Sequence, residues 1–317
     1  MIRRKTSAIV ESGILAAIAV IFTLIGNYIP VLDVIVSVWW PLPIILCGRR
    51  NGLMWSVLCL LVTGAVVAVL ISPLQAVTQV LILGILGLVM GEGMRRQKSP
   101  ASVLLWGSLG ALLSVVLSGL AAYFLMGINV VESFTHAIAE SVQMTKDIYD
   151  TLGVSGIMTT ESLERMQHML SLVLPAGLLL SCPISAFVNY WAARKVLSRL
   201  GDPYPWFPPF ATWTLPRWIL GGYGLGMATL LYFRGDETSY GFLGGFLGGY
   251  TLFTVASMLL LLQGLSVVLW YVQVRGKPRF WFPLAVLTSF VIPLVSQFLV
   301  VMGAIEMVTD QRKLRKR

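Results

Sequence analysis

Apolar residues of this chain form nine stretches that short polar segments separate. The stretches cover roughly residues 8–28, 33–47, 52–71, 75–92, 101–126, 169–193, 217–233, 241–274 and 280–306. A helix that crosses a bilayer needs about 20 predominantly apolar residues. Stretch 33–47 is short for a crossing and carries Pro41 and Pro43, whereas stretch 241–274 is too long for one upright crossing. The pattern predicts an all-α fold, a polytopic bundle of transmembrane helices with eight or nine apolar segments.

The first stretch repeats small residues at four-residue spacing. Ala8, Ser12 and Ala16 form one row, and Gly13 and Ala17 form a second row beside it. Residues four apart lie on one face of a helix, and small side chains let two helix backbones approach closely in a membrane. The row predicts a helix contact, whose partner is either another helix of the chain or a separate subunit. The stretch is too long for a signal peptide, so we expect it to be retained.

A glycine-rich segment, "GFLGGFLGGY", opens the stretch at 241–274. Its glycines recur as a helical stripe, and no Lys-Ser or Lys-Thr pair follows as a phosphate-binding loop requires. We therefore expect Gly245 and Gly249 to mediate helix packing, with the first helix as one candidate partner, and no nucleotide to bind there.

Composition narrows the class of protein. Hydrophobic residues make up 57% of the chain, and charged residues make up 12%, about half the usual share of a soluble domain. This excludes a soluble enzyme and a disordered chain. The net charge of +9 comes from basic residues clustered between the apolar stretches. Such clusters are typical of cytoplasmic loops, so we expect a lipid bilayer and no nucleic acid as partner.

The loop charges also predict the orientation. If the N-terminus is cytoplasmic, the loops at 49–51, 94–100, 194–217 and 275–279 all fall inside, and all are basic. The long loop 127–168 then falls outside, and it holds six acidic residues against two basic ones. Eight crossings place the basic tail inside and nine place it outside. We expect it inside, with the last stretch a re-entrant hairpin at Pro283 and Pro293 or another segment that fails to cross.

The outer loop itself predicts a helical hairpin. Apolar residues recur at helical spacing over 131–152, Gly153 and Gly156 interrupt the pattern, and Thr160 is placed to cap a second helix. This hairpin is either a structural cap or a lid over a binding site.

Polar residues near the outer ends of two predicted spans are the candidate ligand site. Asn27, Tyr28 and Asp33 flank the first turn, and Gln75 and Gln79 begin the fourth span. Polar groups within a membrane are costly unless they find partners. These side chains therefore either line a small-molecule pocket open to the outside or bond to one another.

The sequence holds no signature of catalysis or metal binding. His136 and His168 lack the spacing of paired ligands, and the three cysteines read as buried thiols. No nucleophile elbow or paired-carboxylate motif is present. We expect no enzyme activity, no cofactor and no metal. Glu11, inside the first span, is expected to reach the cytoplasmic surface or to pair with a basic loop residue.

The first 193 residues resemble the substrate-binding S component of energy-coupling-factor vitamin transporters. The resemblance rests on the six-span layout, the short second span, the outer loops and "SGILAAIAVIF". In that family an AxxxA pattern on the first helix faces the coupling subunit, and Ala8, Ser12 and Ala16 match it with Ser for one Ala. The resemblance implies a small-molecule ligand and a coupling membrane subunit. We expect two domains, 1–193 with its external hairpin 127–168, and a membrane extension 194–317.

Over its whole length the chain resembles the YybS-like family of multi-spanning proteins of Gram-positive bacteria. The segments "LLLQGLSVVLWYVQVRGKPRF" (260–280) and "GAIEMVTDQRKLRKR" (303–317) carry the match. Glu306 and Asp310 fill acidic places of the family ending, while Gln311 stands where an aromatic is usual. The resemblance implies a protein of the bacterial cytoplasmic membrane and no particular reaction.

Two functions remain open from the sequence. The first is a protein that binds or transports a small molecule from the outer face, for which a polar cavity would argue. The second is a scaffold or regulator, in some cases a homo-oligomer, that holds partners through its helix faces, for which a bundle packed solid by aromatics and glycines would argue. A membrane enzyme acting on lipids is a weaker third.

Overall fold

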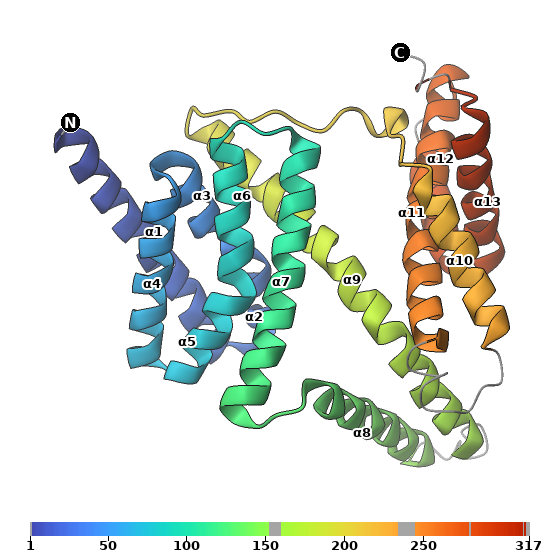
Figure 1. The fold of residues 1–317 in the computed structure, drawn as a ribbon, viewed down its shortest axis with the longest axis horizontal. Coiled ribbons are helices and arrows are strands. Elements are labelled where there is room, and N and C mark those ends of the chain that lie inside the picture. The colour runs from blue at the N-terminus through green and yellow to red at the C-terminus, as the bar shows by residue number, and fades with distance from the viewer. Residues whose placement is uncertain (1, 152–159, 234–244, 279, 313, 315–317) are drawn as a thin grey trace. The chain divides into compact units, whose positions relative to one another are not determined.

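The computed structural model describes residues 2–151, 160–233, 245–278, 280–312 and 314, and these are helical with short connections and without strands (Figure 1). The expected all-α polytopic bundle is therefore confirmed. The elements run in this order: α1 (Ile2–Tyr28), α2 (Pro30–Trp39), α3 (Pro41–Asn51), α4 (Leu53–Leu70), α5 (Pro73–Gln79), η1 (Val80–Gly84), α6 (Ile85–Arg95), α7 (Pro100–Met126), α8 (Val130–Thr151), α9 (Thr160–Arg199), η2 (Phe210–Thr212), α10 (Trp218–Tyr232), α11 (Leu247–Val274), α12 (Trp281–Val291) and α13 (Pro293–Thr309).

The helices form two compact units. Unit 1 comprises Met1–Ser141 and Leu179–Trp206, and unit 2 comprises Val142–Leu178 and Phe207–Arg317. The chain therefore passes from one unit to the other within α8, within α9 and between Trp206 and Phe207. The domain boundary between 193 and 194 stays a prediction, because a compact unit is not by itself a domain that folds alone.

Seven helical stretches of the described residues are long and apolar enough to cross a membrane. Two of them are composite: Val31–Asn51 joins α2 to α3, and Pro73–Arg95 joins α5 to α6 through the π-helical turn η1. The second span is thus longer than its apolar core suggested, since the helix continues past Pro41 and Pro43. The pair α12–α13 is an eighth crossing if its two bent halves count as one.

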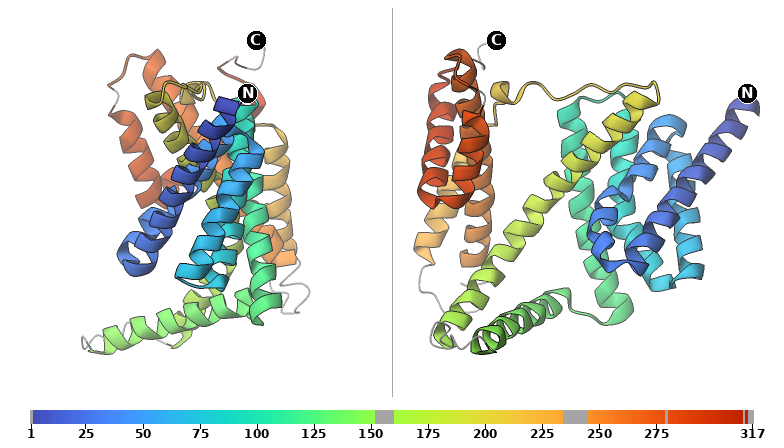
Figure 2. Two further views of the ribbon diagram at one scale, coloured as in Figure 1. Left: turned by 90° about the vertical axis from the view of Figure 1, so that its left-hand side faces the viewer. Right: turned by 180° about the vertical axis from the view of Figure 1, so that it is seen from behind.

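Unit 1 is held by close approach between helices α3 and α6. A Cβ built on Gly91 would lie 2.9 Å from the Ile45 carbonyl oxygen, and one built on Gly48 would lie 3.1 Å from the Gly91 Cα. Only glycine leaves room for such a backbone contact. Figure 2 shows the first seven helices from two further sides, with α6 beside α7 and α1 beside α4.

The helix ends of unit 1 follow familiar capping chemistry. Ser72 and Ser99 accept hydrogen bonds from the backbone N–H groups of Gln75 and Ser102, and each is followed by a proline in the first helical turn. Gly127 ends α7 in the left-handed region at φ 64°, a conformation that glycine adopts at little cost.

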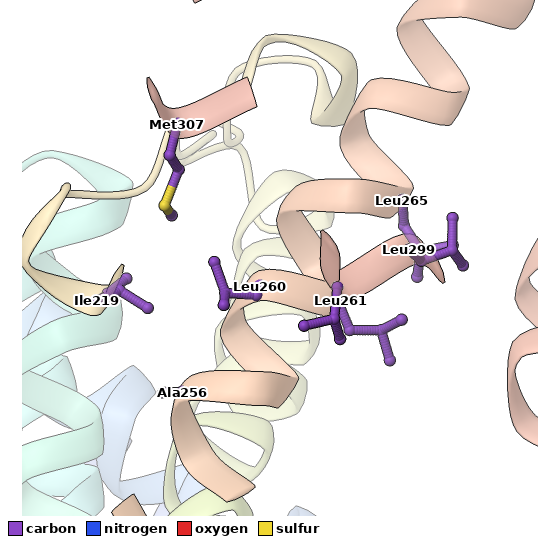
Figure 3. Packing of buried hydrophobic residues seen from close by; sticks show 8 residues of the cluster. Ile219, Ala256, Leu260, Leu261, Leu265, Leu299 and Met307 are labelled. Carbon is purple, nitrogen blue, oxygen red and sulfur yellow. The ribbon is translucent and has the colours of Figure 1, made fainter. Parts of the chain in front are cut away.

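The core of unit 2 lies between α10, α11 and α13. Figure 3 shows seven of its side chains labelled: Ile219, Ala256, Leu260, Leu261, Leu265, Leu299 and Met307. A Cβ built on Gly264 would overlap the Leu299 backbone, and one on Gly303 would overlap the Leu260 backbone. Here too, glycines let two helices touch through their main chains.

The last apolar stretch is bent, as its prolines indicated. The axes of α12 and α13 meet at 116° across Ile292, directly before Pro293. The tail beyond α13 contacts the segment before α10: the Arg312 guanidinium donates hydrogen bonds to the carbonyls of Ala211 and Trp213. The tail and the 207–217 segment therefore lie at the same end of unit 2, and the expected number of crossings stays a prediction.

The loop expected to form an external hairpin contains α8 and the first turns of α9. Helix α8 matches the amphipathic segment expected at 131–152, and α9 begins at Thr160 and continues without a break to Arg199. Gly153 and Gly156, expected to separate the two helices, lie outside the described residues.

Candidate functional site

A buried polar contact joins three helices of unit 1. Trp40 Nε1–H donates to the hydroxyl oxygen of Thr23 at 2.9 Å, and the Thr23 hydroxyl donates to Gln79 Oε1 at 3.0 Å, with the Ala19 carbonyl as a second acceptor at 3.1 Å. The Trp40 and Thr23 side chains are almost completely buried. These hydrogen bonds fix the amide oxygen of Gln79, whose side chain is half-buried.

This contact lies toward the end of unit 1 that holds the turns at residues 29 and 71–72, which we call the distal end. Asn27 and Tyr28 are exposed there, one turn along α1 from Thr23. Asp33 packs against Gly26, where a Cβ would lie only 2.5 Å from Asp33 Oδ1. The missing side chain of Gly26 therefore lets an exposed carboxylate approach α1.

The five residues expected to bind a ligand are thus brought to one end of unit 1, but they differ in role. Gln79 belongs to the hydrogen-bonded cluster with Thr23 and Trp40. Asn27, Tyr28 and Asp33 are exposed, and Tyr28 is 72% exposed. Gln75 is half-buried, and its backbone N–H is bonded to the Ser72 hydroxyl.

The small-residue row of α1 faces the chain's own helices. Ala8, Ser12 and Ala16 are buried, and Ser12 Oγ lies 3.2 Å from Cys47 Sγ of α3. The second row differs, since Gly13 and Ala17 are exposed and nothing lies within 4 Å of a Cβ built on Gly13. A separate subunit would have to contact α1 on this second side.

The glycine stripe contributes to helix packing in unit 2. A Cβ on Gly249 would overlap the Thr229 side chain, and a Cβ on Gly245 would overlap the Phe233 ring. Thr229 belongs to α10, and Phe233 follows its last residue. Gly248, between them in the stripe, has nothing near it. Gly241 and Gly244 lie outside the described residues.

Arginine and acidic side chains gather at the opposite end of unit 1, which we call the basic end. Arg49 forms two bonds to the Asp202 carboxylate, at 2.9 and 2.7 Å, and a third to the Met94 carbonyl at 2.6 Å. Arg50 pairs with Glu11 at 2.7 Å. Glu11 therefore has the basic loop partner that was one of its two expected roles.

The segment after α9 folds across this basic end. The Tyr204 hydroxyl donates to the Lys98 carbonyl, Arg194 Nε donates to the Tyr204 carbonyl at 3.0 Å, and the Tyr190 hydroxyl donates to the Pro205 carbonyl at 2.5 Å. Burial raises the pKa of the Tyr204 phenol above its ordinary value, so the group stays protonated and remains a donor.

Unit 2 has its own buried charge pair. Arg312 Nε donates to Glu306 Oε1 at 2.8 Å, and both side chains are nearly inaccessible, at 0% and 4%. The Arg312 guanidinium also donates to the Ala211 carbonyl, the Trp213 carbonyl and the Ser266 hydroxyl. Glu306 Oε2 is buried and has no hydrogen-bond partner among the described residues.

Sequence reasoning missed Thr23, Asp202, Gln263 and Arg312. Gln263 was detectable, because a polar residue in the middle of an apolar stretch usually has a buried partner. Here its Oε1 accepts the Leu215 N–H at 3.0 Å. Arg312 was counted only as one of several tail cations, and nothing in the local pattern distinguishes it from its neighbours. Within the described part of the chain no group of three or more His, Cys, Asp or Glu residues is placed to hold a metal.

Comparison with known proteins agrees with this architecture. No solved structure matches the chain. A relative from Bacillus subtilis (strain 168), "Uncharacterized protein YybS", is 24% identical over 310 residues, which cover 96% of this chain and 97% of the relative. The expected YybS-like resemblance is confirmed. Residues 17–307 match the family described as "Predicted membrane protein (DUF2232)", and the chain, a multi-pass membrane protein, belongs to that family.

Proposed function

We propose that this membrane protein binds a small polar molecule at the distal end of unit 1, as the first step of its uptake. The observation that supports the proposal is the bond from buried Thr23 to Gln79. Because Trp40 and Thr23 fix the Gln79 oxygen, the Gln79 amide N–H₂ group keeps a defined direction. A rigid donor at a half-buried position is what recognition of a polar ligand requires.

Asp33 supplies the complementary group. Its exposed carboxylate lies against Gly26, on the α1 segment that follows Thr23. An amide donor and a carboxylate acceptor at one end of the same unit suit a small molecule that carries both donors and acceptors. The resemblance of residues 1–193 to vitamin-binding S components favours a water-soluble vitamin as the ligand class.

The positive-inside rule supports an orientation in which the basic loops are cytoplasmic and this end is on the outer side of the membrane. Arg49, Arg50 and the segment at 94–100 all lie at the basic end, and the turns at 29 and 71–72 lie at the distal end. A ligand bound at the distal end would therefore arrive from outside the cell.

Thermal unfolding of the purified protein in detergent tests this proposal. A panel of water-soluble vitamins should contain at least one compound that raises the Tm of the wild-type protein, because a ligand that binds only the folded state stabilises it. Gln79→Ala should lose most of that rise. The control Gln273→Ala removes an exposed amide of α11 in unit 2 and should keep the full rise.

Two results would count against ligand binding at this site. One is a panel in which no compound raises the Tm. The other is an equal rise for wild type, Gln79→Ala and Gln273→Ala, which would place the ligand elsewhere on the protein.

The second candidate function is a scaffold that holds a partner protein. The observation that favours it is the exposed side of α1, where Gly13 and Ala17 lie among Ile9, Val10 and Ile14. Small residues on an apolar face allow close helix contact. A photocrosslinking amino acid at position 13 should capture a second protein in the membrane under this function, and only lipid if α1 faces the bilayer.

A further inference from the structure

The Arg312 side chain occupies a site built by other parts of unit 2. Its guanidinium donates to Ala211 O at 2.7 Å, Ser266 Oγ at 2.8 Å, Trp213 O at 2.9 Å and Glu306 Oε1 at 2.8 Å. These four acceptors come from the segment before α10, from α11 and from α13. We refer to them together as the guanidinium cage.

The cage is held together by bonds in which Arg312 takes no part. The Leu215 N–H donates to Gln263 Oε1 at 3.0 Å, the Ser266 hydroxyl donates to the Phe210 carbonyl at 2.7 Å, and Arg217 Nε donates to the Met307 carbonyl at 3.2 Å. The first two tie the segment before α10 to α11, and the third ties it to α13. The segments that carry the acceptors are therefore joined by bonds that do not depend on Arg312.

Arg312 leaves one acceptor atom of the cage unused. Its side-chain Nε and its backbone N–H both donate to Oε1 of Glu306, while Oε2 is buried and has no partner in the part of the chain that the structure describes. An arginine and a carboxylate commonly pair through two parallel bonds. The short link from α13 through Asp310, which has a left-handed φ of 46°, ties Arg312 to one geometry.

We infer that this site is a preformed binding site for a guanidinium group, which the protein's own Arg312 fills as an intramolecular ligand. A free guanidinium compound has the same planar set of donors without the covalent tether. It is therefore able to occupy the cage when the arginine side chain is removed, and it has access to both oxygens of Glu306. This inference does not depend on the proposed ligand site in unit 1.

Chemical rescue of Arg312→Ala tests the inference in the full-length protein. The variant leaves Glu306 buried without its cation, so its Tm in detergent should fall below that of wild type. Ethylguanidinium chloride should restore at least half of the lost Tm. The same concentration of tetramethylammonium chloride should not, because that cation has no N–H donors.

Three controls make the test specific. Wild type should gain nothing from ethylguanidinium, since Arg312 already fills the cage. Arg275→Ala removes an exposed arginine whose guanidinium lies over the Tyr271 ring, and any change in its Tm should not respond to ethylguanidinium. The double variant Glu306→Gln with Arg312→Ala should lose most of the rescue, because it lacks the carboxylate.

Several outcomes would overturn the inference. An Arg312→Ala protein with unchanged Tm would show that the cage needs no cation. Equal restoration by both salts would show an ionic-strength effect. If Arg312→Ala cannot be recovered as a monodisperse protein even when it is extracted in ethylguanidinium, the cage is not preformed.

Discussion

At the scale of single residues, the contact between Thr23, Trp40 and Gln79 gives each of its buried polar groups a partner. The Thr23 hydroxyl accepts from Trp40 and faces two acceptors, so one small side chain serves three helices. A buried donor left without an acceptor costs about 1–3 kcal/mol, more than the net gain from a typical hydrogen bond. Stability at such positions therefore depends on leaving no group unpaired.

Thr23→Val should destabilise the protein by about 1–3 kcal/mol, because valine has nearly the same shape but leaves the Trp40 N–H without an acceptor. Thermal unfolding in detergent measures the effect. Thr78→Val is the matched control, since the Thr78 hydroxyl is exposed and donates to the Leu74 carbonyl within the same helix. Equal losses for both variants would mean that the Thr23 contact contributes nothing specific.

At the scale of helices, contacts through small residues decide which elements pack together. Ala8, Ser12 and Ala16 bring α1 close to α3 and α4, while Gly264 and Gly303 bring α11 against α13. Lipid supplies no hydrophobic driving force between helices, so the fit of these surfaces carries much of the association energy. Adjacent positions on one helix should consequently tolerate substitution very differently.

Ala16→Leu should cost about 1–3 kcal/mol, the usual penalty for overpacking a filled site. Ala16 is 2% exposed, whereas its neighbour Ala17 is exposed, so Ala17→Leu is a control on the same helix. The two Tm values of the purified single chain measure the difference. If Ala17→Leu proves the more damaging variant, the row that makes the essential contact is the second one.

Gly264→Ala should also destabilise unit 2, because the added methyl group would overlap the Leu299 backbone. Overpacking should cost about 1–3 kcal/mol of stability. This outweighs the roughly 1 kcal/mol that alanine gains over glycine in helix propensity. Gly248→Ala adds the same methyl group to α11 in open space and should be neutral or stabilising. Urea or thermal unfolding of both variants decides the matter, and a stabilised Gly264→Ala would contradict the close contact.

At the scale of the whole molecule, the basic residues are concentrated in a few of the connections between helices. The basic end of unit 1 holds Arg49, Lys98 and Asp202. In unit 2, the arginines flank the helices: Arg217 precedes α10, Arg275 follows α11 and Arg312 follows α13. A membrane protein places such loops in the cytoplasm. Because the tail contacts the segment before α10, both should lie on one side of the membrane.

Labelling with an impermeant thiol reagent on intact cells should show this orientation. In a background without the native cysteines, Arg50→Cys, Gln97→Cys, Arg199→Cys and Gln311→Cys should be protected, and Asp147→Cys should react. The reverse pattern would invert the orientation and move the distal end to the cytoplasmic side. Reaction at position 311 with protection at 199 would contradict the contact between the tail and the segment before α10.

The helices could be predicted from the sequence better than the contacts between them. Apolar stretches, prolines and glycines have local effects, so they located α8, the start of α9 and the break at Pro293. Asp202 lies 153 residues from Arg49 and Ala211 lies 101 residues from Arg312, and no local pattern encodes such pairings. Thr23 was missed for the same reason, since a threonine in an apolar helix is unremarkable until Trp40 and Gln79 are placed beside it.

The bond between Arg49 and Asp202 also limits how early unit 1 can be completed while the chain is synthesised. Asp202 follows Arg49 by 153 residues in the chain. A ribosome that adds about 5–20 residues per second needs about 8–30 s to make that interval. During this time α1 to α7 enter the membrane while the Arg49 guanidinium has no carboxylate from the later segment. Unit 1 is therefore completed only after the segment that carries Asp202 has been made, and its early helices depend for that interval on the insertion machinery and on their glycine contacts.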